Sequence, residues 1–278
     1  MDRVAAALQR DGVQPGQAIA ICALNSVRYA ALFLGALRAG VVVAPLAPSS
    51  TADSLASMLR DAQARHLFLD KAAQDLVPAD GALQCISLDG AAPGRAFDDW
   101  LAPEGAQPAP VSVEPAAPFN IIYSSGTTGL PKAMVHSHGG IVLTHLKTHG
   151  LQHDVRPGDR FMFLGSTGWI VWNLMVGSLL AGATVVLSDG NPTSPDDGAL
   201  WDFIDRQQVT LFEAARTLGG RARTLTLDTP AGPVVVDNGQ HILIGAYTAT
   251  LGLMARLGAV PEAALLALPL ALPFADGT

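Results

Sequence analysis

Cysteine, charge and basic residues are all scarce in this chain of 278 residues. The two cysteines, Cys22 and Cys85, are too few for a disulfide framework or a cysteine-ligated zinc site, and this favours a reducing, cytoplasmic location. Charged residues make up 15% of the chain, against about 25% in an ordinary soluble domain. The net charge of -7 argues against a nucleic-acid partner, because a groove for phosphates needs clustered basic residues.

The distribution of apolar residues also predicts neither a secretory signal nor a membrane span. No long apolar run follows the first residues, so no signal peptide is expected. Residues 161–188 carry no charge and are long enough to cross a bilayer. They contain four glycines, however, and divide into two short apolar runs around a helical pattern, which is typical of buried parallel strands. We therefore expect no integral membrane span.

Apolar residues make up 49% of the chain, which excludes disorder for most of it. Helical and strand patterns alternate along the first part. The expected helices cover residues 2–10, 26–38, 51–64 and about 71–76, and the expected strands cover 18–24, 41–45, 66–70 and 83–88. This alternation predicts an α/β fold with a parallel sheet flanked by helices. Residues 89–118 contain six prolines and are expected to form a surface linker, after which the alternation resumes and reaches residue 213.

A loop rich in hydroxyls and glycines follows the apolar strand that ends at Tyr123. It reads YSSGTTGLPK over residues 123–132. Its glycines permit backbone angles that point N–H groups at an anion, its hydroxyls donate hydrogen bonds, and Lys132 adds a positive charge. The spacing differs from that of a Walker A loop. The composition predicts a polyphosphate site, with a polar turn as the alternative. The candidate phosphate ligands are Ser124, Ser125, Gly126, Thr127, Thr128, Gly129 and Lys132.

The motif YSSGTTGLPK resembles the phosphate-loop signature of the AMP-forming acyl-adenylate and acyl-CoA synthetases. Blocks on both sides of it look most like acetoacetyl-CoA synthetases: VHSHGG (135–140), RPGDRFMF (156–163), TGWIVWN (167–173) and AGATVVLSDG (181–190). The resemblance implies a partial N-terminal domain of such a ligase over residues 1–211. It also implies ATP with Mg2+, coenzyme A and a small carboxylic acid, acetoacetate first, as substrates, with Lys132 as a catalytic residue. Ala133 stands where the family has glycine.

Two points of this resemblance stay open. Trp169, in the TGW block, would lie near the acyl pocket by its position, or else is a core tryptophan. The family's downstream adenine, ribose and magnesium motifs and its C-terminal lysine have no match here, so charge developing at the α-phosphate would lack a local stabiliser. We therefore expect a weakly active or inactive ligase, or a folded chain with no activity of its own.

A second resemblance begins near residue 208. QVTLFEAARTLGGRARTLTLD (208–228) is similar to FAD-binding amine-oxidase and phytoene-desaturase flavoproteins, and GPVVVDNGQHILIGAY (232–247) to squalene-associated FAD-dependent desaturases. It implies a flavoprotein fragment over 212–278, a short α+β tail with a hairpin within 221–239 and a helix within 240–257. In that fragment Glu213 would bind the ribose of FAD, and Gly219, Gly220 and Arg221 would bind its phosphates. Because the first half of the flavoprotein motif has no match upstream, a surface position at the end of a strand is the favoured interpretation of Glu213.

The two resemblances meet within residues 209–213, where the segment VTLF (209–212) is similar to both families. Because a natural fusion more often joins complete domains through a linker, the junction predicts a chimeric reading frame.

Five histidines cluster within residues 136–153, and His145, His149 and His153 are spaced four apart. Since Gly150 interrupts the helical pattern and no H-E-x-x-H motif is present, we expect solvated or capping histidines and no metal site.

Overall fold

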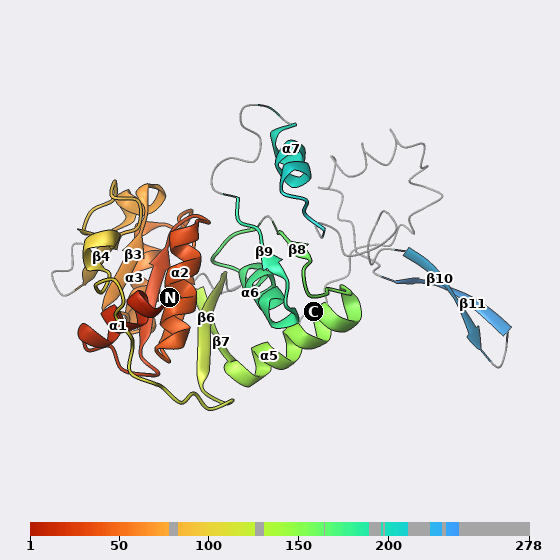
Figure 1. Cartoon of the computed structure of the whole chain (residues 1–278), viewed down its shortest axis with the longest axis horizontal. Helices are drawn as coiled ribbons and strands as arrows, with labels where there is room; N and C mark the ends of the chain where they lie inside the picture. Colours follow the sequence, from red (N-terminus) through yellow and green to blue (C-terminus); the bar gives the residue numbers. More distant parts are fainter. Residues whose placement is uncertain are drawn as a thin grey trace, which may run out of the picture. The chain divides into compact units, whose positions relative to one another are not determined.

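The computed structural model divides into two compact units, Met1–Ala214 and Ala215–Thr278 (Figure 1). It describes residues 1–77, 83–125, 131–163, 165–188, 196 and 198–210, together with the strands at 223–229 and 232–238.

The first unit is built on a seven-stranded sheet with the order β5-β4-β3-β1-β2-β6-β7. Its strands are β1 (Ala18–Cys22), β2 (Val42–Leu46), β3 (His66–Leu69), β4 (Gln84–Ser87), β5 (Arg95–Ala96), β6 (Pro118–Ser125) and β7 (Pro131–Ser137). Neighbouring strands pair in parallel from β5 to β6, and only β6 and β7 pair antiparallel. The parallel sheet expected from the alternating patterns is confirmed, with an antiparallel hairpin added at one edge.

Helices cover both faces of the sheet, as strands buried on two sides require. In β1, Ile19 and Ile21 pack with helices α1 (Asp2–Arg10) and α2 (Val27–Arg38). The alternate residues Ala20 and Cys22 pack with helix α3 (Ala52–Asp61) on the other face. Hydroxyl groups cap two of these helices, since Ser26 accepts a hydrogen bond from the Tyr29 N–H and Thr51 accepts one from the Ser54 N–H. The short helix expected after β3 is a 3-10 helix, η1 (Lys71–Leu76).

The proline-rich segment 89–118 does more than link two parts of the chain. It contributes strand β5 and the single-turn helix α4 (Phe97–Trp100), and both aromatic ends of that helix are buried. The Trp100 ring lies 4.8 Å from the Phe68 ring in an edge-to-face arrangement, and its Nε1 donates a 2.7 Å hydrogen bond to Asp11 Oδ2. A surface linker was expected here, but two aromatic side chains anchor the segment to the core that contains residues of α1 and α2.

Apart from α7, which buries no residue, the rest of the first unit adds to the core formed by α1 and α2. It comprises α5 (His138–Lys147), the π-helix η2 (Thr148–Gln152), β8 (Arg160–Phe161), α6 (Ile170–Gly177), η3 (Ser178–Ala181), β9 (Thr184–Val185) and α7 (Ala199–Arg206). Strands β8 and β9 pair in parallel on either side of α6, which confirms the strand–helix–strand pattern within 161–188. Among the described residues, no helix is both long enough and apolar enough to cross a membrane.

The second unit contains a hairpin of β10 (Arg223–Thr229) and β11 (Gly232–Asn238). Thr229 pairs with Gly232 at one end of the hairpin, and these are the residues around which the sequence predicts a hairpin. The helix expected within 240–257 lies outside the described residues.

Candidate functional site

The phosphate-loop motif lies on the β6–β7 hairpin. Ser124 at the end of β6 pairs with Lys132 at the start of β7, and the residues between them include the loop 126–130. Gly126, Thr127, Thr128 and Gly129 lie outside the described residues, as does the side chain of Ser125. Because β6 runs parallel to β2, the motif leaves the sheet at the edge formed by the carboxyl ends of the parallel strands. Open α/β sheets bind their ligands at this edge.

The alternation of side chains along the hairpin separates its two faces. In an antiparallel pair, directly opposite residues point to the same face, and every second residue repeats that face. The pairs Asn120–His136 and Ser124–Lys132 therefore share one face. Lys132 is exposed on that face, next to the loop, where its ammonium is available to an anion.

Tyr123 points to the opposite face and fastens β6 to helix α3. Its hydroxyl lies 2.7 Å from Asp61 Oδ2 and 3.2 Å from the Met58 carbonyl oxygen. Burial and the neighbouring Asp61 carboxylate together raise the pKa of Tyr123, so the hydroxyl stays protonated as a donor. The strand that carries the motif is thus held from the α3 side.

Two buried asparagines hold the same strand from the α6 side. Asn120 on β6 donates from Nδ2 to Oδ1 of Asn173 on α6 at 3.0 Å, and both side chains are fully buried. Nδ1 of His136 lies 3.1 Å from Asn120 Oδ1. Burial lowers the pKa of His136, which favours its neutral form. Since Asn120 Oδ1 is an acceptor, the neutral His136 ring must carry its proton on Nδ1 to donate this hydrogen bond.

The TGW block packs across the same carboxyl edge. The Thr167 hydroxyl donates a 2.8 Å hydrogen bond to the carbonyl of Ala23, just beyond β1. A Cβ on Gly168 would approach the Ala47 nitrogen at 3.2 Å, so this loop lies against the end of β2. The register Val43–Asn120 sets Ala47 level with Ser124 on the neighbouring strand. The structure therefore brings the TGW block and the phosphate-loop hairpin to one edge.

Trp169 follows this loop as the N-terminal cap residue of α6, and 44% of its surface is exposed. It is therefore not a core tryptophan. That position is taken by Trp172, whose ring contacts Tyr29 edge to face at 4.8 Å. An exposed indole at the edge beside the hairpin fits a wall for a bound molecule.

The histidine cluster differs from the expectation of solvated or capping side chains. His145, His149 and His153 are all buried, with ring centroids 6.0 Å and 5.4 Å apart along the chain. Gly150 does not end the helix, because a π-turn follows α5 and His153 N–H donates to the Thr148 carbonyl at 2.9 Å. Burial, with repulsion from His149 and His136, lowers the pKa of His145 to about 4. In the described part of the chain, no three potential ligands gather for a metal ion.

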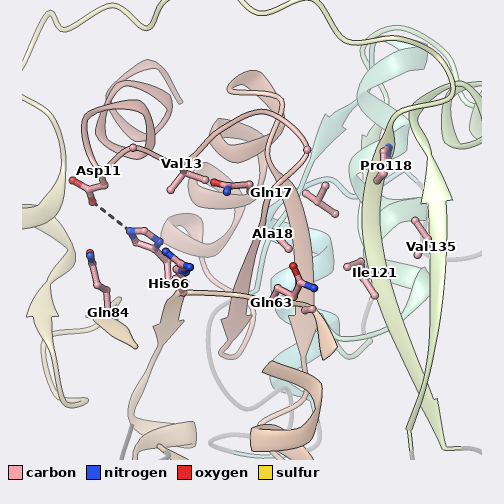
Figure 2. A pocket seen from close by; sticks show the side chains of 15 residues that line it. Asp11, Val13, Gln17, Ala18, Gln63, His66, Gln84, Pro118, Ile121 and Val135 are labelled. Carbon is pink, nitrogen blue, oxygen red and sulfur yellow. Dashed lines mark ion pairs between the residues drawn. The ribbon is translucent and has the colours of Figure 1, made fainter. Parts of the chain in front are cut away.

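A cavity of about 590 Å³ opens at the opposite edge of the sheet (Figure 2). Its lining includes Asp11, which follows helix α1, and His66 and Gln84 at the amino ends of β3 and β4. Ile121 and Val135 of the hairpin also line it (Figure 2). His66 Nε2 lies 3.7 Å from Asp11 Oδ2. The Asp11 carboxylate already accepts hydrogen bonds from Arg10 and Trp100, so it serves to hold the chain together. We place the candidate site at the carboxyl edge instead.

The predicted site residues are thus only partly visible. Ser124, Lys132 and Trp169 lie at one edge of the sheet. The four residues proposed for FAD, Glu213, Gly219, Gly220 and Arg221, lie outside the described residues. Sequence reasoning missed Asn120, Tyr123 and Asn173, which fix the hairpin. The available signal was an asparagine within an otherwise apolar strand.

Two family models match the chain. The one described as AMP-binding enzyme covers residues 1–230, and the one described as flavin containing amine oxidoreductase covers residues 205–265. Acetoacetyl-CoA synthetase of Gallus gallus is 44% identical over 120 residues, which is 42% of this chain and 18% of the relative. Acetoacetyl-coenzyme A synthetase of Rhizobium meliloti is 42% identical over 95 residues, which is 34% of this chain and 15% of the relative. The matched stretch is thus less than a fifth of these relatives.

Solved structures agree on the fold. The acetoacetyl-CoA synthetase from Streptomyces lividans has a TM-score of 0.67 and 33% identity, covering 75% of this chain and 36% of the other. The N-terminal subdomain of Klebsiella oxytoca NpsA, solved with 3-hydroxybenzoyl-AMSN, has a TM-score of 0.59 and 22% identity. It covers 75% of this chain and 49% of the other, and shows the fold alone.

Proposed function

Because the chain belongs to the family of AMP-binding enzymes, we propose that it acts in an AMP-forming acid–thiol ligase reaction on a small carboxylic acid. Acetoacetate is the first candidate acid, since acetoacetyl-CoA synthetases are among the relatives. ATP with Mg2+ and coenzyme A are the other substrates. The observation that carries the proposal is the strand–loop–strand motif, which ends in Lys132 at the carboxyl edge of the sheet.

The proposed reaction has two steps. A carboxylate oxygen of the acid attacks the α-phosphorus of ATP, the bond to the bridging oxygen breaks, and pyrophosphate leaves. The coenzyme A thiolate then attacks the acyl carbon of the acyl adenylate, and AMP leaves. Negative charge moves onto phosphate oxygens in the first step, so fixed positive charge and N–H donors beside those oxygens lower the barrier.

The residues would divide this work by position. Lys132, exposed at the start of β7, would neutralise phosphate charge. Ser124, Ser125, Thr127 and Thr128 would donate from their hydroxyls, and the glycines 126 and 129 would let backbone N–H groups turn toward the phosphates. Trp169 would form a wall of the acyl pocket. Mg2+ typically arrives with few protein ligands and several phosphate oxygens, so the lack of a ligand cluster in the described residues is compatible with this role.

The test measures pyrophosphate released from ATP in the presence and absence of acetoacetate. Because the family's downstream motifs have no match here, we expect only weak carboxylate-dependent release from the wild-type chain, and Lys132→Ala should abolish it by removing one charge-stabilising group. The matched control is Lys147→Ala, which removes an exposed lysine at the end of α5 and should leave release unchanged.

ATP binding is measured in parallel by equilibrium dialysis. Binding that Lys132→Ala weakens, without carboxylate-dependent release, would support the phosphate site and contradict the ligase activity. Neither binding nor release, from a chain whose circular dichroism shows a folded α/β protein, would overturn the proposal.

A second candidate function rests on the match to flavin containing amine oxidoreductases at residues 205–265. Under this alternative, residues 212–278 are a fragment of an FAD-dependent desaturase, with Glu213 at the ribose and Gly219, Gly220 and Arg221 at the phosphates. A purified chain that absorbs in the visible flavin band, and releases FAD on denaturation, would favour it. A colourless protein that does not retain added FAD would contradict it.

We also propose that the chain is chimeric, with its junction within residues 209–213. The match to AMP-binding enzymes ends at residue 230 and the match to flavin containing amine oxidoreductases begins at residue 205, so the two overlap over residues 205–230. Under this proposal residues 1–211 are the ligase part, and residues 212–278 are the flavoprotein part. One uninterrupted genomic read across codons 200–220 in independent isolates would contradict an artificial join. We place the ligase part in the cytoplasm, which cell fractionation tests.

A further inference from the structure

We propose that the Asn120–Asn173 hydrogen bond is a positioning link that couples the phosphate-loop hairpin to helix α6 and its Trp169. This inference rests on the proposed function, because it assigns the link to the nucleotide site at residues 124–132. Asn120 and Asn173 act through the residues that they hold and do not themselves contact the nucleotide.

The link is placed between the two parts of the candidate site. Asn120 lies on β6, four residues before Ser124, and shares its face of the hairpin. Asn173 lies on α6 one turn after Trp169, the cap residue of that helix. The 3.0 Å bond between the two amides is the one side-chain hydrogen bond between the hairpin and α6 in the part of the chain that the structure describes. A displacement of the hairpin or of α6 therefore changes the position of the other.

Because this hydrogen bond is buried, breaking it carries a large cost in free energy. Both asparagines are fully buried, and a buried amide without a partner loses its hydration with nothing in return. Two apolar side chains at these positions would fill the same space and place no requirement on orientation. The amide pair instead favours one relative placement of β6 and α6, because the Nδ2–H of Asn120 must point at Asn173 Oδ1.

The chain of donors extends across the hairpin. His136 on β7 donates from Nδ1 to Asn120 Oδ1, and Asn120 donates from Nδ2 to Asn173. His136 is four residues after Lys132 and on the same face. Both strands that flank the loop are thus joined to α6 through Asn120, whereas Tyr123 joins β6 separately to α3.

The first measurement needs no nucleotide. Hydrogen exchange of the β6–β7 backbone amides is compared between the wild-type chain, Asn173→Leu and Val176→Ala. Asn173→Leu keeps the branched shape of the side chain but leaves Asn120 Nδ2 without an acceptor, so protection of the hairpin amides should fall about tenfold or more. Val176→Ala disturbs a buried α6 residue that has no bond to Asn120, and it should leave hairpin protection within about twofold.

The second measurement follows Trp169 when Mg-ATP is added. The chain is labelled with fluorotryptophan, and the Trp169 signal in the fluorine NMR spectrum is assigned by its loss in Trp169→Phe. In the wild type, ATP should shift this signal. In Asn173→Leu the shift should fall at least about threefold at saturating ATP. In Tyr123→Phe, which cuts the anchor to α3, the shift should persist.

Each outcome decides the matter. Hairpin protection that is lost equally in Asn173→Leu and Val176→Ala, or in neither, overturns the link, whatever happens with ATP. If the wild type does not bind ATP, the proposed function fails, and the link then stands or falls on hydrogen exchange alone. An ATP-induced Trp169 shift that survives Asn173→Leu overturns the coupling even though the nucleotide site is confirmed.

Discussion

Helices α5 and α6 approach so closely at Gly177 that the position tolerates no side chain. A Cβ built on Gly177 would lie 2.1 Å from Nδ1 and 2.6 Å from Cγ of His145. Ordinary van der Waals contact begins at 3.4 Å, so the ring or a helix would have to move by about 1.3 Å. His145 is only 3% exposed and has little room to give way. We therefore predict that Gly177→Ala destabilises the first unit.

The size of the effect follows from two opposing terms. Overpacking a filled core costs about 1–3 kcal/mol. Replacing glycine by alanine in a helix gains up to about 1 kcal/mol, because glycine loses more backbone freedom on folding. The net loss for Gly177→Ala should be about 1–2 kcal/mol. Urea unfolding, followed by the fluorescence of the buried Trp100 and Trp172, measures it by linear extrapolation.

A double-mutant cycle separates the clash from other causes. His145→Ala removes the ring that the new methyl group would strike, so in this background Gly177→Ala should be neutral or stabilising. The coupling energy between the two positions should be about 1–3 kcal/mol. The reasoning is refuted if Gly177→Ala costs the same in both backgrounds, or if it is neutral in the wild type.

Two further predictions concern the same core. The pKa of His145 is lowered to about 4 and that of His149 is also lowered, both chiefly by burial, so the unfolded chain binds more protons than the folded one below the ordinary histidine pKa of 6.5. The free energy of unfolding should be full above about pH 6.5 and fall as the pH drops toward 4, and a urea midpoint unchanged between pH 7 and 4.5 in wild type, or falling as steeply in His145→Gln, would contradict this. Trp100→Phe removes the donor to Asp11 and should cost about 1–2 kcal/mol in urea unfolding, whereas Trp169→Phe, at a tryptophan that is 44% exposed, should change the free energy of unfolding little. Equal effects of the two substitutions would show that segment 95–102 is not anchored as described.

Local patterns in the sequence determined much of the fold. The alternation of apolar strands with capped helices fixed the parallel sheet, because each pattern reflects which faces of one element are buried. Ser26 and Thr51 marked helix starts through hydroxyls that accept nearby N–H groups. The glycines and hydroxyls before Lys132 predict a phosphate loop, and the structure places the start of this motif at the end of strand β6. All of these signals act over a few residues.

Contacts between distant residues were decided only by the tertiary structure. Asn120 and Asn173 are 53 residues apart, and Trp100 and Asp11 are 89 apart, so no periodicity relates them. The proline-rich composition of 89–118 hid the two aromatic anchors within it. Gly150 was expected to break a helix, yet a π-turn absorbs it and keeps three histidines in the core. The local sequence pattern indicates which secondary structure a segment favours. Packing against distant segments decides which side chains are buried away from water, and this burial sets the pKa of His145 and the placement of the hairpin.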